Sequence, residues 1–161
     1  MLSVLMAGGG FLPLDPSHPT SRHEEILAEV NASILLCSPH YSSRYSKAVK
    51  TVIPINRDTV KAYGALNQNA RVPDNTTSSN TAYILFTSGS TGRAKGITIE
   101  NGALASSVMA FGPMVHLDSA PRVFQFASLT FDAAMLEIFA TLLFGGCICV
   151  PSEDERLNDV A

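Results

Sequence analysis

The chain has 161 residues, about the length of one domain, and its 46% hydrophobic against 16% charged residues exclude an intrinsically disordered protein. Its 11 Lys and Arg residues against 14 Asp and Glu residues give a net charge of −3 at pH 7. Because this balance is mildly acidic and no run of basic residues occurs, we expect neither nucleic acid nor an anionic membrane as the main partner.

The N-terminal part of the chain predicts a short extended segment followed by a helix. Residues 11–14 (FLPL) form the extended segment. It ends at Asp15-Pro16 and Pro19, because the two prolines prevent a helix from continuing. Thr20 or Ser21 is expected to cap the helix, since a hydroxyl there can accept a backbone N–H of the first turn. The buried stripe of this helix is expected to consist of Ile26, Leu27 and Val30.

Two strands and a polar loop are expected next. Residues 33–37 (SILLC) and 51–55 (TVIPI) predict two strands, the first of them buried. The mostly polar residues 42–50 between them favour a weak helix. From residue 67 to residue 80, Asn, Ser and Thr dominate and no apolar period survives, so we expect a surface loop or linker there.

The second half of the chain contains further strands and two helices. The expected strands lie at residues 81–86, 97–99, 122–126 and 147–150. One helix is expected from a cap at Asn101 to about Met114, and another from Asp132 to Phe144, closed by Gly145-Gly146. Strand, helix and strand in succession imply parallel pairing with right-handed crossovers, so we expect an α/β layered sandwich with a mostly parallel sheet.

Cysteine and histidine spacing indicates no metal or redox site. The cysteines, Cys37, Cys147 and Cys149, form no CxxC pair, so we expect them to be structural residues in a protein of the reducing cytoplasm. No ligand spacing relates the four histidines, His18, His23, His40 and His116. The apolar stretch at residues 135–150 is interrupted by Glu137 and two glycines, and is shorter than the ~20 residues of a membrane-spanning helix.

The most informative segment is the stretch TSGSTGRAKG, which runs from Thr87 to Gly96 directly after an expected strand. Phosphate oxygens need convergent donors: glycines let backbone N–H groups approach, hydroxyls add donors, and a lysine adds positive charge. The segment offers these groups in Thr87, Ser88, Gly89, Ser90, Thr91, Gly92 and Lys95. It is not a Walker loop, because Ala94 and Gly96 occupy the places of that loop's second Gly and its Ser or Thr. Composition alone leaves a flexible Gly/Ser turn as the alternative.

Three sequence blocks stand in a specific order along the chain. They read AGGGFLPLDP at residues 7–16, YILFTSGSTG at residues 83–92 and FASLTFDAA at residues 126–134. Together they resemble core motifs of the adenylate-forming enzymes, and within that superfamily the adenylation domains of nonribosomal peptide synthetases. By this resemblance the second block is the phosphate-binding motif and the third lines the amino-acid pocket.

The resemblance implies an enzyme that activates an amino acid with Mg-ATP, releases pyrophosphate, and passes the aminoacyl group to the phosphopantetheine thiol of a carrier-protein domain. It implies that residues 87–92 and Lys95 hold the ATP phosphates. It also implies that Asp132 binds the α-ammonium group of the amino acid, and that Ala133 and Leu136 face its side chain. Apart from the resemblance, an Asp at this place is most simply a helix cap.

Three positions depart from the family's usual pattern. Ala94 stands where Pro is common, Asn101-Gly102 replaces a frequent His-Arg pair, and Met6 stands where Lys is often found. None of these changes removes a group that the chemistry requires. The change at Ala94 is expected to leave the phosphate-binding loop less preorganised.

The resemblance also predicts the domain organisation. It covers nearly the whole chain, whereas the family's motifs for adenine, ribose and the catalytic lysine have no counterpart in it. We therefore expect residues 1–161 to be part of one adenylation domain, cut at both ends within its large N-terminal subdomain. Such a segment would hold no catalytic residue of its own, would be inactive alone, and would have the carrier domain and the remainder of the synthetase as partners.

Two other functions stay open. A fragment of an acyl- or aryl-CoA ligase would have the same superfamily motifs, but such an enzyme binds no α-ammonium group and usually lacks an Asp at the position of Asp132. A truncated gene would instead give a non-catalytic product. The reading frame on both sides of the chain distinguishes this last possibility from the other two.

Overall fold

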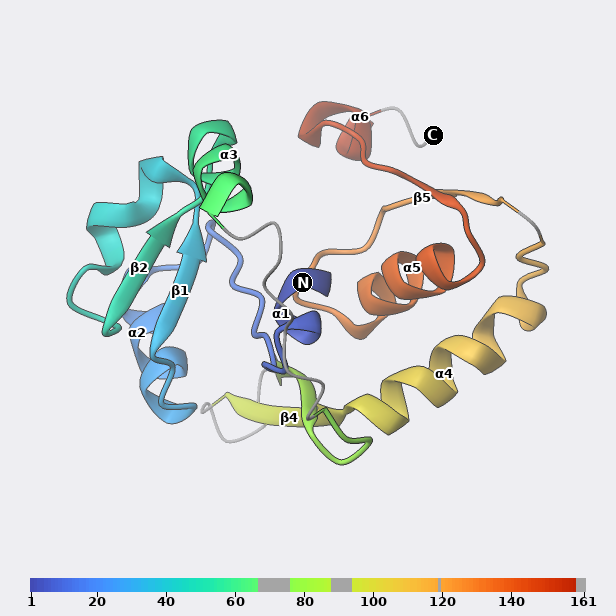
Figure 1. The fold of residues 1–161 in the computed structure, drawn as a ribbon, viewed down its shortest axis with the longest axis horizontal. Helices are drawn as coiled ribbons and strands as arrows, with labels where there is room; N and C mark the ends of the chain where they lie inside the picture. The colour runs from blue at the N-terminus through green and yellow to red at the C-terminus, as the bar shows by residue number, and fades with distance from the viewer. Residues whose placement is uncertain (67–75, 88–93, 119, 159–161) are drawn as a thin grey trace. The chain divides into compact units, whose positions relative to one another are not determined.

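The computed structural model of the chain describes residues 1–66, 76–87, 94–118 and 120–158 (Figure 1). The chain divides into two compact units, of which the larger holds residues 1–15 and 73–161 and the smaller holds residues 16–72. Both units contain helices and strands, which confirms the expected α/β class. Among the described residues, no helix has the length and apolar character needed to cross a membrane.

The described part of the smaller unit contains one pair of parallel strands and two α-helices. In chain order it contains α2 (Thr20–Glu29), β1 (Ile34–Cys37), the 3₁₀ helix η1 (Pro39–Tyr45), β2 (Thr51–Pro54) and α3 (Arg57–Leu66). β1 and β2 run parallel, with Ile34 opposite Thr51, which confirms both expected strands. The expected burial of β1 is wrong, because the side chains of Ile34 and Leu36 are 58% and 48% exposed.

The start of α2 differs from the expectation. Pro19 stands at its N-cap, and no side chain caps the helix. The Thr20 hydroxyl instead accepts a hydrogen bond from Nε of Arg44 at 2.6 Å, so the expected capping by Thr20 or Ser21 is wrong. The expected stripe is confirmed at Ile26 and Leu27, which are buried, whereas Val30 follows the helix and is half-buried.

Two further segments of the smaller unit depart from the sequence pattern. The weak helix expected over residues 42–50 is wrong, because η1 begins at Pro39 and ends at Tyr45, and turns follow it. The pattern did not indicate α3. Its start is held by a reciprocal pair: the Thr59 N–H donates to Oδ1 of Asn56 at 2.8 Å, and the Asn56 N–H donates to the Thr59 hydroxyl at 2.8 Å. This pair satisfies exposed N–H groups much as a capping box does.

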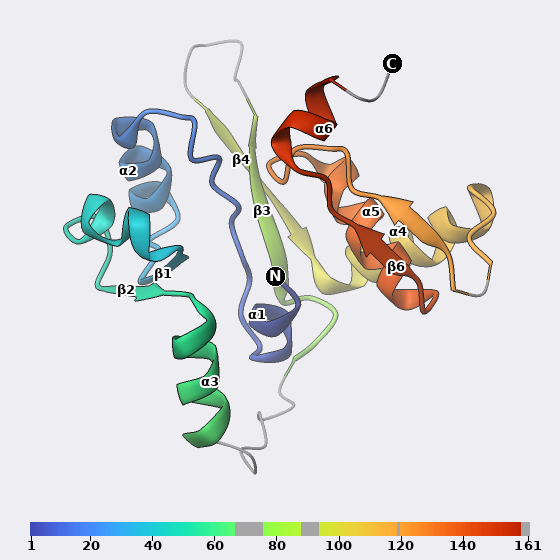
Figure 2. The same ribbon diagram turned by 90° about the horizontal axis from the view of Figure 1, so that it is seen from above.

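The larger unit contains two strand pairs and four helices within its described part. In chain order its elements are α1 (Leu2–Met6), β3 (Thr81–Thr87), β4 (Lys95–Glu100), α4 (Asn101–Met114), β5 (Arg122–Phe124), α5 (Asp132–Leu143), β6 (Cys147–Cys149) and α6 (Glu153–Asn158). β3 and β4 form an antiparallel hairpin (Figure 2), whereas β5 and β6 are parallel. The described strands thus form three two-stranded sheets, two of them parallel.

The helices of the larger unit follow the expected bounds, with one change at a cap. α4 ends at Met114 as expected, but Glu100 is its N-cap and the expected cap by Asn101 is wrong. The Asn101 side-chain amide donates instead to the Thr77 carbonyl at 3.2 Å. α5 ends one residue before the expected Phe144, and Gly145 closes it with a φ of +70°, a conformation that glycine adopts without strain. Residues 67–75 of the expected polar loop lie outside the described residues.

The core of the larger unit joins the three sequence blocks. It consists of buried residues from β3, α4 and α5, namely Ala82, Tyr83, Leu85, Leu104, Val108, Ala134, Met135, Phe139 and Ala140. Phe11, from the first block, packs against this core, and its ring centroid lies 5.7 Å from that of Tyr83 and 6.2 Å from that of Phe139. The Phe11 N–H also donates to the Ala82 carbonyl at 3.0 Å, which confirms an extended backbone at this residue.

Candidate functional site

The two ends of the expected phosphate-binding loop meet at the hairpin of β3 and β4. Thr87 is the last residue of β3, Lys95 is the first residue of β4, and the two are direct partners in the antiparallel register. Both side chains are exposed. The loop residues between them, Ser88, Gly89, Ser90, Thr91 and Gly92, lie outside the described residues. The structure therefore brings Thr87 and Lys95 together, and the role of the loop between them stays a prediction.

The packing of the hairpin explains the glycine that follows Lys95. Gly96 lies opposite Phe86 in the ladder. A Cβ at Gly96 would lie 3.1 Å from the tip of the Phe86 ring, which is tighter than ordinary van der Waals contact. The absence of a side chain at Gly96 thus leaves room for the Phe86 ring to lie against the backbone of β4.

Asp132 is the first residue of α5, and its carboxylate faces solvent. Phe131 is the N-cap, and Oδ1 of Asp132 accepts the N–H of Ala133 at 2.8 Å. The side chain is exposed, so the carboxylate keeps lone pairs accessible to a ligand. A negative charge in the first helical turn is also favoured by the helix dipole.

The negative charge of Asp132 acts on the phenol of Tyr83. Burial raises the pKa of Tyr83, and the negative charge of Asp132 raises it further, because both effects disfavour the phenolate. Tyr83 is buried at 5% exposure, in the same strand that ends at Thr87. Thr87 lies four positions after Tyr83 in the strand, a path of about 13 Å. β3 therefore links the neighbourhood of Asp132 to the start of the phosphate-binding motif.

The other two expected substrate residues lie on the same helix as Asp132. Ala133 is exposed, and Leu136 is half-buried and packs against the core of the larger unit. Leu136 lies one helical turn after Asp132, as expected from the spacing of four residues. The structure thus brings the three residues to the N-terminal half of α5, and their contact with a substrate stays a prediction.

Glu137 takes part in this region in a way that its spacing alone did not indicate. Its carboxylate, on α5, accepts hydrogen bonds from the backbone N–H groups of Phe126 and Ala127, both at 3.1 Å. β5 ends at Phe124, two residues before the expected end, and the N–H groups of Phe126 and Ala127 donate to Glu137 instead of to a strand. Glu137 lies three positions beyond the block at residues 126–134, and its place in the sequence gives no signal for bonds that reach back to Phe126 and Ala127.

The three cysteines are free thiols, and one histidine, His23, is buried. Cys147 is exposed, Cys37 and Cys149 are half-buried, and all three are free thiols. Burial raises the pKa of the Cys37 thiol, which disfavours the reactive thiolate. His23 is buried and its Nδ1 shares a hydrogen bond with the Tyr45 hydroxyl. In the described ranges no three His, Cys, Asp or Glu side chains are grouped in a way that could hold a metal ion.

Comparisons with known proteins agree along the whole chain. Residues 1–161 match the family model described as AMP-binding enzyme. The chain is 66% identical over 161 residues to nonribosomal peptide synthetase 1 of Aspergillus fumigatus, and 60% identical over 160 residues to nonribosomal peptide synthetase nlsA of Emericella nidulans. These alignments cover 100% and 99% of this chain, and the chain spans about 3% of the length of each relative.

A solved structure shows the same fold. It is the Vibrio cholerae adenylation domain AlmE in complex with glycyl-adenosine-5′-phosphate. The TM-score is 0.75 at 21% identity, with coverage of 98% of this chain and 34% of that chain. At 21% identity this similarity establishes the fold alone. It confirms the expected fold, that of part of the large subdomain of an adenylate-forming enzyme.

Proposed function

The chain belongs to the AMP-binding enzyme family, and from this we propose that it is a segment of an amino-acid-activating adenylation domain in a nonribosomal peptide synthetase. The observation that supports this proposal most directly concerns β3. This strand contains Tyr83, whose pKa is raised by burial and by the Asp132 charge, and it ends at Thr87, where the phosphate-binding motif begins. The two relatives, both nonribosomal peptide synthetases by name, support the same conclusion. So does the aminoacyl-adenylate bound to the structural neighbour.

In the proposed reaction, a carboxylate oxygen of the amino acid attacks the α-phosphorus of ATP. The bond from that phosphorus to the bridging oxygen breaks, and pyrophosphate leaves with its electron pair. An in-line displacement of this kind depends on positioning and on neutralisation of charge more than on covalent help from the protein. Residues 87–92 would supply hydroxyl and backbone donors, and Lys95, opposite Thr87, would neutralise phosphate charge.

Mg²⁺ fits this chain as an ion that arrives on the triphosphate. The described residues group no three side chains that could hold a metal by themselves. Mg²⁺ in such sites keeps waters and substrate phosphate oxygens among its ligands and takes only one or two from protein carboxylates. When bound, it would shield phosphate charge, and the part left to this chain is the binding of the phosphate oxygens by the loop and Lys95.

Asp132 is the residue of α5 that can bind the α-ammonium group. Its carboxylate is exposed and accepts one N–H, from Ala133, among the described residues. The carboxylate of Glu137 is already engaged by donors of the preceding loop. An ammonium group bound to Asp132 would form a charge-assisted hydrogen bond, and Ala133 and Leu136 would lie beside the substrate side chain.

The next step defines the proposed partners. The phosphopantetheine thiol of a carrier domain would attack the carbonyl carbon of the aminoacyl-adenylate, forming a thioester while AMP leaves. We propose the carrier domain and the rest of the synthetase as partners, and the cytoplasm as the location. Because the chain spans about 3% of the two relatives, these partners belong to a polypeptide much longer than 161 residues.

Amino-acid-dependent exchange of pyrophosphate into ATP tests the proposal. The protein to use is the product of the full reading frame that contains these 161 residues. We expect exchange with at least one α-amino acid and none with the corresponding acid that lacks the amino group. Activity with acids lacking that group, together with thioester formation on free coenzyme A, would show an acyl- or aryl-CoA ligase instead. Stop codons on both sides of the chain would show a non-catalytic product.

A further inference from the structure

One carboxylate of α5 is bound on both oxygens by the loop that precedes the helix. Oε2 of Glu137 accepts the N–H groups of Phe126 and Ala127 at 3.1 Å and the side-chain amide of Gln125 at 3.2 Å. Oε1 of Glu137 accepts the Ala127 N–H at 3.2 Å. The Gln125 amide also donates to the Ala127 carbonyl. The half-buried Glu137 side chain thus binds the N–H groups of Phe126 and Ala127, while the Gln125 N–H donates to the Cys149 carbonyl at 2.9 Å.

The direction of helical side chains explains how Glu137 reaches this loop. Long side chains on an α-helix point back toward its N-terminus. Glu137 is the sixth residue of α5, so its carboxylate is carried back past the first turn to the segment that enters the helix. The two backbone N–H groups that it accepts have left the β5–β6 ladder and need another acceptor.

The held loop leads directly to Asp132. Only residues 128–131 separate Ala127 from Asp132, and they form a tight turn in which the Phe131 N–H donates to the Ser128 carbonyl at 2.9 Å. The Ser128 and Thr130 hydroxyls are hydrogen-bonded to each other at 3.0 Å. With Ala127 bound by Glu137 at one end and α5 packed in the core at the other, the turn holds the backbone that enters Asp132 at both ends.

We propose that Glu137 is a positioning residue for amino-acid binding: it holds residues 125–127 and thereby fixes the orientation of Asp132. This inference rests on the proposed function, in which Asp132 binds the α-ammonium group. In this proposal Glu137 acts through the loop, because its carboxylate already accepts the N–H groups of Phe126 and Ala127 and the Gln125 amide. Loss of this hold would weaken binding of the amino acid and leave the phosphate side of the site, on the β3–β4 hairpin, unchanged.

The test uses the full synthetase and the variant Glu137→Gln. The substitution keeps the shape and one acceptor oxygen, but it removes the negative charge that strengthens these bonds, and its NH₂ group cannot accept the Ala127 N–H that Oε1 accepts in the wild type. We expect the KM for the amino acid to rise at least tenfold in pyrophosphate exchange, with the KM for ATP within twofold of wild type. Hydrogen exchange at the Phe126 and Ala127 amides should accelerate. Glu29→Gln, the same change at an exposed position of α2, is the control and should alter neither constant.

Each possible result of this experiment either supports or overturns the proposed role of Glu137. If the wild-type synthetase shows no amino-acid-dependent exchange, the proposed function fails and the inference fails with it. If wild type exchanges and Glu137→Gln leaves the KM for the amino acid unchanged, the inference alone fails. A variant that raises both KM values together, or that does not fold, shows a general structural role and overturns it as well. Gln125→Ala should give a smaller effect than Glu137→Gln, since the two backbone bonds to Glu137 remain.

Discussion

At the scale of single residues, the two carboxylates of α5 differ in how far their lone pairs are already used. Glu137 is half-buried and accepts several N–H groups from the loop before the helix. Asp132 is exposed and accepts the N–H of its own neighbour. A cation that approaches the start of α5 therefore meets Asp132 as the available acceptor, and this difference is the reason to assign ammonium binding to Asp132.

The variant Asp132→Asn tests that assignment. It keeps the size of the side chain and removes its charge, so a charge-assisted hydrogen bond of about 1.5–3 kcal/mol is lost. We expect the KM for the amino acid in pyrophosphate exchange to rise by roughly tenfold to 150-fold, with the KM for ATP unchanged. Asp118→Asn, at an exposed position of the same unit, serves as the control. An unchanged KM for the amino acid would remove Asp132 from the site and favour the ligase alternative.

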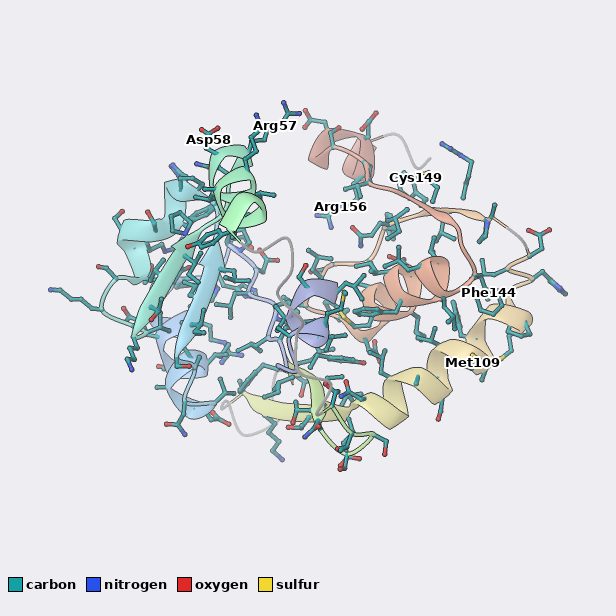
Figure 3. The ribbon with its side chains drawn as sticks, in the orientation of Figure 1. Arg57, Asp58, Met109, Phe144, Cys149 and Arg156 are labelled. Atoms are coloured by element: carbon teal, nitrogen blue, oxygen red, sulfur yellow. The ribbon has the colours of Figure 1, made fainter. Side chains whose placement is uncertain are left out.

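At the scale of elements, α4 and α5 pack closely because one residue has no side chain. Gly112 is buried in α4, and a Cβ there would lie 2.9 Å from Cδ2 of Phe144 and nearer still to two other ring carbons. Figure 3 labels Phe144 at the end of α5, beside α4. The ring occupies the place that a side chain at residue 112 would need. Because α5 carries Asp132 and Glu137, this contact also sets where the candidate site lies.

The substitution Gly112→Ala should therefore destabilise the domain although alanine favours helices. We expect the free energy of unfolding to fall by about 1–3 kcal/mol, the usual cost of overpacking a core. Thermal unfolding of the synthetase's adenylation domain measures this. Gly64→Ala is the matched control in α3, where an added Cβ meets nothing within 4 Å, and it should leave stability unchanged or raise it by up to about 1 kcal/mol. A Gly112→Ala variant as stable as wild type would contradict the packing.

The same scale shows how much of the fold was predictable from the sequence. Helix bounds were predictable where a strong stop signal exists, as at Gly145, whose positive φ closes α5. Caps were not, because Thr20 and Asn101 use their polar groups on distant partners, Arg44 and the Thr77 carbonyl. Such bonds join residues 24 positions apart, and no local rule contains them. α3 was missed although Asn56 and Thr59 form a local capping signal.

The candidate site was predictable to a similar degree. Motif resemblance indicated Thr87, Lys95 and Asp132, and the structure pairs the first two across the hairpin. The effect of the Asp132 charge on Tyr83 and the hold of Glu137 on the loop depend on how α5 packs within the larger unit. These are tertiary relations, and a sequence pattern that describes one element at a time cannot give them.

At the scale of the whole molecule, a large amount of apolar surface is uncovered in the described residues. The larger unit alone exposes Met114 at 77%, Val150 at 74%, Phe131 at 64% and Phe126 at 51%. The mean hydropathy of the chain, +0.19, agrees with this surface. Side chains of this size and number are typical of surfaces that another part of a protein covers.

The isolated 161 residues should therefore behave differently from the complete synthetase. We expect the short chain to self-associate, since its apolar surface and strand edges are exposed. We also expect it to show no pyrophosphate exchange, since the proposed adenine, ribose and catalytic-lysine contributions come from other parts of the domain. Light scattering and the exchange assay, run beside the complete synthetase, check both points. A monodisperse short chain with robust exchange would contradict the proposal that it is a segment.

Phe11 gives the molecule a property that matters for engineering. Its ring packs against those of Tyr83 and Phe139, so one aromatic cluster joins residues that are 72 and 128 positions away from Phe11 in the sequence. A graft that transplants α5 from another synthetase, to change which building block is incorporated, would set a foreign residue against two native rings. Chimeras that move Phe11, Tyr83 and Phe139 as a set would keep this cluster whole, whereas those that split it would begin with a mismatched interior.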